Sequence, residues 1–293
     1  MTLKKVPRSG VLYVVPALLV ITLVMFYPVL YTLVMGFFKN TLRMRVPEFA
    51  GLAQFKKLFN DEVFVKSIGN TVVWTAGSVF LQFLLGFTAA MLLHQPFVKF
   101  KTIIRILLMV PWVLPSIIGS SVWKWMYNAD YGIINYILKT LHIIDANKTW
   151  LSNPNTAMYA VIAVNAWKMF PFVLLMVEAA LQSVSKDLKE AAVIDGAGKI
   201  RIFGAVTWPA VAPACYSVLL LLLIWTLNAF TFIYNLTLGG PAHATEVMAM
   251  YIYNKAFAEF DFGLASAGSA ILFIFSMLVS IFYIRMTAKN GEE

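Results

Sequence analysis

The stretch VAPACYSVLLLLLIWTLNAFTFIYN, residues 211–235, contains no charged residue. A helix of this length can cross the hydrocarbon core of a bilayer, about 30 Å, because each residue adds about 1.5 Å. Comparable apolar runs cover residues 11–37, 68–93, 102–125, 157–181 and 265–286. The chain of 293 residues is 60% hydrophobic and 13% charged, whereas about a quarter of the residues in soluble domains are charged. We therefore predict one all-α integral membrane domain, residues 1–293, with six transmembrane helices.

The net charge of +9 indicates membrane orientation and no nucleic-acid partner. Lysine and arginine occur in short segments between the apolar runs and form no stripe with interleaved aromatic residues. Six spans place both termini on one side, and basic residues are about twice as dense in the segments on that side. We therefore expect both termini in the cytoplasm, although the opposite loop around residues 39–66 is itself basic.

Few residues in the sequence are candidates for catalysis, metal binding or disulfide formation. Cys215 is the only cysteine and lies inside an apolar run, so we expect it to pack in the interior. The three histidines are scattered in loops, and we predict neither a metal site nor a catalytic residue. The phosphate-binding pattern G-x-x-x-x-G-K-[ST] does not occur, since Lys199 is followed by Ile200. We expect no cofactor in this chain, and any energy from ATP has to come through a partner.

The segment 184–209 has the pattern of a short surface helix on the cytoplasmic side. Ser185 or Asp187 can cap its start, and Gly196 can end it as a glycine with positive φ. Glu190 can form ion pairs at the rim of a contact. One helical face carries Leu188, Ala191, Ala192 and Asp195. Small alanines on that face let another surface approach closely, so we predict a docking helix.

Three parts of this segment carry a family resemblance: Glu190-Ala191-Ala192, Gly196 and Val206-Thr207-Trp208-Pro209. This spacing resembles the EAA loop of ABC importer permeases, with Val206 and Trp208 in place of the usual Ile and Leu. Elsewhere, Trp167-Lys168 with Pro171-Phe172, and Gly239-Gly240-Pro241, look like the carbohydrate-uptake branch of that family. The resemblance implies the type I permease fold. It also implies that Glu190, Ala191, Ala192, Asp195 and Gly196 couple the chain to an ATPase.

The resemblance further implies a set of partners in a bacterial inner membrane. A second permease subunit, usually a different chain, completes the path, and two ABC ATPase subunits bind ATP and Mg. An extracytoplasmic solute-binding protein delivers the carbohydrate, and it lands on the loops before the second and the last spans. The lipid bilayer surrounds the spans.

Polar and aromatic side chains inside three spans are the candidate solute path, because polar groups there usually face an interior cavity. The candidates are Trp112, Asn165, Lys168, Met169, Phe172, Thr226 and Asn228. Four of them share one face of the fourth span, and Trp112 lies between two prolines that can kink the third. A sugar needs hydroxyl or amide partners together with an aromatic platform. By resemblance, related permeases draw solute contacts from these same helices.

Other interpretations remain open for these residues and for the function. An asparagine in a span is as often a hydrogen-bonding contact between helices, and Lys168 more often pairs with a carboxylate or carbonyl than with solute. An anionic solute, such as glycerol 3-phosphate or another sugar derivative, would use the charge of Lys168. A secondary transporter or channel would need a charge relay or repeated halves in the spans. A membrane enzyme would need a cluster of catalytic residues. The sequence shows none of these.

Overall fold

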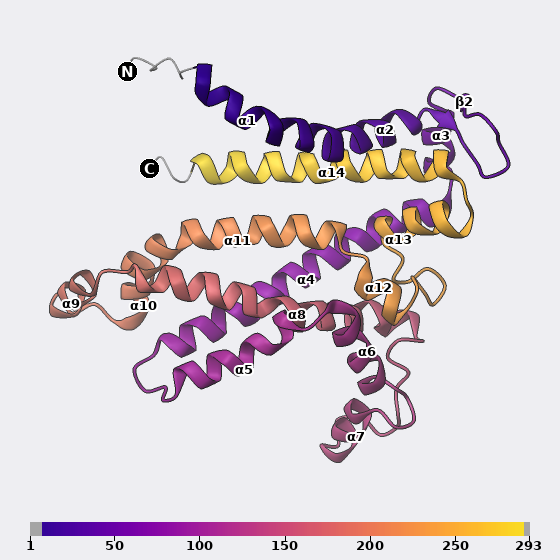
Figure 1. Ribbon diagram of the computed structural model, residues 1–293. Helices are drawn as coiled ribbons and strands as arrows, with labels where there is room; N and C mark the ends of the chain where they lie inside the picture. Colours follow the sequence, from indigo (N-terminus) through magenta and orange to yellow (C-terminus); the bar gives the residue numbers. More distant parts are fainter. Residues whose placement is uncertain (1–7, 290–293) are drawn as a thin grey trace. The chain divides into compact units, whose positions relative to one another are not determined.

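The computed structural model describes residues 8–289, with side chains over residues 13–285, and the chain is helical almost throughout (Figure 1). Helices long and apolar enough to cross a membrane are Tyr13–Met35, Glu62–His94, Pro154–Gln182, Lys199–Asn228 and Phe262–Arg285. A pair of shorter helices, Lys101–Val113 and Ser116–Met126, is apolar enough when taken together, and counted as one broken span it brings the number to six. The all-α, six-span prediction is confirmed. The strands among the described residues are β1 (Phe38–Lys39) and β2 (Glu48–Phe49), which pair as one small hairpin.

Chain contacts group the described residues into two compact units. The first contains residues 8–65 and 252–274. Its first span consists of α1 (Arg8–Ile21), the π-helical turn η1 (Thr22–Phe26) and α2 (Tyr27–Met35). Every side chain described from Tyr13 to Tyr31 is exposed. Since most of these side chains are apolar, we infer that lipid is their solvent.

Beyond the first span, the same unit contains the hairpin, α3 (Ala53–Phe59), η3 (Asn254–Ala258) and the start of α14 (Phe262–Lys289). Two ion pairs join its distant segments, Lys57 to Asp261 at 3.0 Å and Lys255 to Asp61 at 3.6 Å. At Gly263 an added Cβ would lie 2.3 Å from the carbonyl oxygen of Phe38. Only glycine lets α14 start so close to the hairpin.

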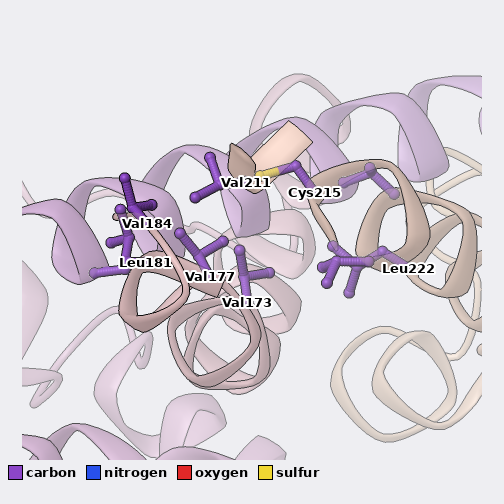
Figure 2. Close-up of a cluster of buried hydrophobic side chains, with 10 residues drawn as sticks. Val173, Val177, Leu181, Val184, Val211, Cys215 and Leu222 are labelled. Atoms are coloured by element: carbon purple, nitrogen blue, oxygen red, sulfur yellow. The ribbon is translucent and has the colours of Figure 1, made fainter. Parts of the chain in front are cut away.

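The second unit contains residues 66–251 and 275–289. Its long helices are most of α4 (Glu62–His94), α8 (Pro154–Gln182) and α11 (Trp208–Asn228). Buried aliphatic side chains of these helices form one core cluster, part of which Figure 2 shows between α8 and α11. The members labelled there are Val173, Val177, Leu181, Val184, Val211, Cys215 and Leu222. The buried thiol of Cys215 is therefore a packing group, as predicted.

The third span is broken, which corrects the prediction of one kinked helix over 102–125. α5 (Lys101–Val113) and α6 (Ser116–Met126) meet at 97°. Pro115 causes the break because proline has no amide hydrogen and disfavours helical backbone in the residue before it. Leu114 is accordingly extended, with φ −60° and ψ 139°.

The fifth span also differs from the predicted range 211–235. Helical structure starts earlier, with α10 (Lys199–Ile202) and η2 (Phe203–Thr207), and α11 ends at Asn228. Ala229 is extended, and the separate short helix α12 (Thr231–Leu236) follows. The side-chain amide of Asn235 donates to the hydroxyl oxygens of Ser120 at 2.6 Å and Ser121 at 3.0 Å. The helices that follow the two breaks, α6 and α12, therefore support each other.

The two polar segments flanking α8 lie at its opposite ends (Figure 1). The segment before α8 folds into the short helix α7 (Ile133–Thr140). Buried Asn135 stabilises it: its amide donates to the carbonyls of Ala129 and Lys148, and its oxygen accepts from the Trp150 indole at 2.9 Å. The segment after α8 forms α9 (Lys186–Ile194).

Candidate functional site

The candidate coupling helix α9 has well-formed ends. At its start, the hydroxyl of Ser185 accepts the amide hydrogen of Leu188 at 3.3 Å. At its end, Gly196 has φ +76°, its amide donates to the carbonyl of Val193 at 3.0 Å, and the amide of Ala197 donates to that of Ala192 at 2.9 Å. These two bonds define a Schellman motif. The predicted cap and the predicted glycine stop are both confirmed.

The surface of α9 is open and more apolar than the motif alone indicated. Glu190, Ala191 and Gly196 are exposed, Ala192 is half-buried, and exposed Asp195 lies one residue past the helix. Large apolar side chains nearby are also exposed, Ile194 at 85% and Ile200 at 89% of full accessibility. Sequence reasoning missed both, because their spacing gives no regular stripe. Such exposed apolar groups are typical of a surface that binds another protein.

The chain next to α9 is anchored on the bundle. Val184, two residues before the helix, is buried in the core cluster with Leu181 and Val211 (Figure 2). On the helix itself, the ammonium of Lys189 lies 3.5 Å from Nε2 of His94, the last residue of α4. These contacts attach α9 to the ends of α4, α8 and α11.

In the candidate solute path, Lys168 lies at the break in the third span. Its side chain is buried, and its ammonium donates to the carbonyls of Pro111 at 2.9 Å, Trp112 at 2.7 Å and also Leu114. An ammonium group has three hydrogens to donate, so these three carbonyls use all of them. Of the interpretations left open by the sequence, the structure shows pairing with carbonyls.

Two of the predicted path residues are in contact, and a third aromatic residue joins them. The ring centroids of Trp112 on α5 and Phe172 on α8 are 6.0 Å apart, and those of Phe172 and Trp225 on α11 are 5.0 Å apart. Trp112 is 39% exposed and Trp225 is 44% exposed. We call these three residues the aromatic row. Trp225 was not predicted, although its place beside the polar Thr226 within an apolar run was a usable signal.

The remaining predicted path residues occupy different environments. Asn165 and Thr226 are buried, and Met169 is half-buried against the core cluster. Nδ2 of Asn165 has no hydrogen-bond partner among the described residues. Asn228 is exposed and donates back to the carbonyl of Ile224 at 2.8 Å. These positions do not test a role in solute contact, which stays a prediction.

An ion pair near the α9 end of the bundle was not predicted. Nε of Arg105 on α5 donates to one carboxylate oxygen of Glu178 on α8 at 2.8 Å, and a second guanidinium nitrogen donates to the other. Such a bidentate contact between arginine and a carboxylate is among the stronger ion pairs in proteins. Sequence reasoning missed it because the two residues lie 73 positions apart in the chain. Glu178 could have indicated the pair, because a carboxylate inside a membrane span requires a cation nearby.

Comparison with known families gives a match over residues 82–289 to the family described as "Binding-protein-dependent transport system inner membrane component". The sulfoquinovosyl glycerol transport system permease protein SmoG of Agrobacterium fabrum is 33% identical, over 94% of this chain and 89% of that protein. The trehalose/maltose transport system permease protein MalF of Thermococcus litoralis is 32% identical, over 95% of this chain and 93% of that protein.

Solved structures share the fold. A bacterial ABC transporter involved in the import of the acidic polysaccharide alginate matches with a TM-score of 0.83 at 20% identity, over 96% of both chains. The alginate transporter in complex with its pentasaccharide-bound periplasmic protein matches with a TM-score of 0.81 at 21% identity, over 96% of this chain and 95% of that one. At these identities the matches show the fold alone.

Proposed function

We propose that this chain, which belongs to the family of inner membrane components of binding-protein-dependent transport systems, is a permease subunit of an ATP-driven carbohydrate importer. The observation that carries the proposal is α9, a capped helix with exposed apolar side chains at one end of a membrane-embedded bundle. A cytoplasmic ATPase subunit is the partner proposed for this surface. The proposal therefore places α9 and both termini in the cytoplasm.

The geometry supports a mechanism for coupling. α9 follows α8 and, through Gly196 and α10, leads directly into α11. When the ATPase pair closes on ATP, displacement of α9 acts on the ends of these two helices. The same helices carry Phe172 and Trp225 of the aromatic row. A change at the ATPase thus reaches the solute path through rigid helices, with no ATP site in this chain.

The proposed solute is a saccharide delivered by a binding protein. Two relatives covering nearly the whole chain are named for the transport of sulfoquinovosyl glycerol and of trehalose and maltose. The aromatic row offers exposed ring faces to the apolar faces of a sugar. A second permease would supply the rest of the path, as the resemblance to ABC importer permeases implies.

The opposite end of the second unit offers a surface for the binding protein. A cavity of about 460 Å³ lies there, between the end of α6 and the loop after α12. Lys124, Trp150 and Pro241 are among its lining residues. The loop after α12 precedes the last span and contains the Gly-Gly-Pro sequence. We propose this loop as part of the landing surface.

Reconstitution tests the proposed function. The purified chain in liposomes is expected neither to hydrolyse ATP nor to transport, because it has no phosphate-binding loop. Both activities are expected when its ATPase and second permease are added, with stimulation by the loaded binding protein. Saccharide content of the co-purified binding protein identifies the solute class. ATP hydrolysis by the isolated chain would overturn the proposal, and a co-purified binding protein loaded with an amino acid would overturn the carbohydrate assignment.

Substitutions in the path test where the solute passes. Trp112→Ala is expected to raise the apparent KM for saccharide uptake about tenfold, because it removes an exposed stacking face, whereas Trp112→Phe keeps a ring and most of the uptake. Asn165→Ala should lower uptake without reducing assembly, since Nδ2 has no partner among the described residues that assembly would lose. Both predictions are checked by measuring saccharide uptake and the yield of assembled complex. If both alanine variants take up saccharide as well as the wild type, these residues do not line the solute path.

A further inference from the structure

Among the described residues, Lys168 is a buried cation, and the proposed transport role does not by itself explain it. Only 6% of the residue is exposed, although ionised groups are costly to bury and usually have partners when they are buried. Its three acceptors belong to α5 and the residue after it, 54 to 57 positions away in the chain. The charge therefore serves a contact between the fourth span and the broken third span.

Pro115 creates the need for this contact. In a continuous helix, the carbonyl of Pro111 would accept the amide hydrogen of residue 115, but proline has none. Because the chain turns by 97° at the break, the carbonyls at the end of α5 lack helical partners. Inside a membrane no bulk water replaces those partners. A cation at the C-terminal end of a helix is also favoured by the helix dipole.

Trp112 is positioned by the same group. Its own carbonyl accepts from Lys168 at 2.7 Å, while its ring lies against Phe172, four residues after Lys168 on α8. The backbone and side chain of Trp112 are thus both attached to one turn of α8. We infer that Lys168 is a positioning residue, which holds the end of α5 so that Trp112 stays in the aromatic row. This inference goes beyond the proposed function and does not depend on which solute is carried.

The inference also bears on solute charge. All three ammonium hydrogens point to backbone carbonyls, so none is left to donate to an anionic solute. In this arrangement Lys168 is therefore not a hydrogen-bond donor for an anionic solute.

Cysteine cross-linking in the assembled complex tests the inference without any solute. Because Cys215 is the only cysteine, a Cys215→Ala background allows selective labelling. The reporter pair is Trp112→Cys with Phe172→Cys, treated with a short bifunctional thiol reagent. A distant control pair is Phe87→Cys with Trp208→Cys, whose native rings are 6.2 Å apart near the α9 end of the bundle. A protease site at exposed Ile143 makes a cross-link within one chain visible in both pairs.

Lys168→Met is expected to lower the yield of the reporter cross-link about tenfold and to leave the control pair unchanged, because it removes three charge-assisted hydrogen bonds. Lys168→Arg keeps the charge and several donors and should restore most of the yield. Lys101→Met is the matched control: it removes an ammonium at the start of α5 that donates to the carbonyl of His94, the last residue of α4, and should leave the reporter pair unchanged.

The inference would be overturned if Lys168→Met gave the same yield of the reporter cross-link as the wild type. It would also be overturned if the yields of the reporter and control cross-links fell equally, because that result indicates general destabilisation. If Lys168→Met does not assemble, Lys168→Gln replaces it. A glutamine variant that cross-links as well as the arginine variant would likewise overturn the inference. None of these outcomes depends on transport, so failure here is distinguishable from failure of the proposed carbohydrate role.

Discussion

Gly86→Ala is expected to reduce severalfold the amount of folded chain in the membrane. A Cβ at this position would lie 2.4 Å from Cβ of Val173 and 2.5 Å from the carbonyl oxygen of Phe170, so α4 and α8 would have to separate. One of these two atoms belongs to the backbone, and no side-chain rotation relieves that clash. Overpacking of an interior costs about 1–3 kcal/mol or more, a large part of the stability of most proteins.

The measurement is the yield of chain in membranes together with the unfolding temperature of the detergent-purified complex. Gly69→Ala is the matched control, because it changes the same residue type in the same helix and its Cβ meets no atom within 4 Å. Alanine favours helix over glycine by about 1 kcal/mol, so this variant should be at least as stable as the parent. Equal yields for both variants would contradict the close packing of α4 on α8.

Gly196→Val is expected to abolish most solute-stimulated ATP hydrolysis while the chain still inserts and assembles. The φ of +76° at this position strains any residue with a Cβ, at a cost of roughly 1–2 kcal/mol. A Cβ there meets no atom of the chain within 4 Å, so the strain comes from backbone conformation and not from a clash with neighbouring residues. Loss of the Schellman motif would redirect the chain between α9 and α11, and α9 would fit its ATPase poorly.

Two companion variants distinguish the effect of backbone conformation at Gly196 from the effect of replacing a glycine in this segment. Gly198→Ala should retain stimulation, because Gly198 has φ −71° and an open surrounding. Gly196→Asn should be intermediate, since asparagine tolerates the left-handed region better than valine. Stimulated hydrolysis and co-purification of the ATPase are measured in reconstituted membranes. Full stimulation in Gly196→Val would show that α9 is not the coupling element.

The breaks in the third and fifth spans show where sequence patterns stop being informative. Hydropathy treats residues 102–125 and 211–235 as uninterrupted runs, because a residue's apolar character does not depend on its backbone conformation. Proline at position 115 indicates a kink, but its 97° angle depends on what supports each half. That support comes from Asn235 of α12 for α6 and from Lys168 of α8 for α5.

Much of this protein follows from the sequence alone, namely the six spans, the all-α fold, the short helix α9 and its stop at Gly196. These features are local: they depend on hydropathy over one helix length, on helical spacing and on one residue type that accepts positive φ. Tertiary structure alone decided the partners of Lys168 and Glu178 and the entry of Trp225 into the aromatic row. The first two join residues 57 and 73 positions apart, and no local pattern specifies which distant helix supplies the matching group.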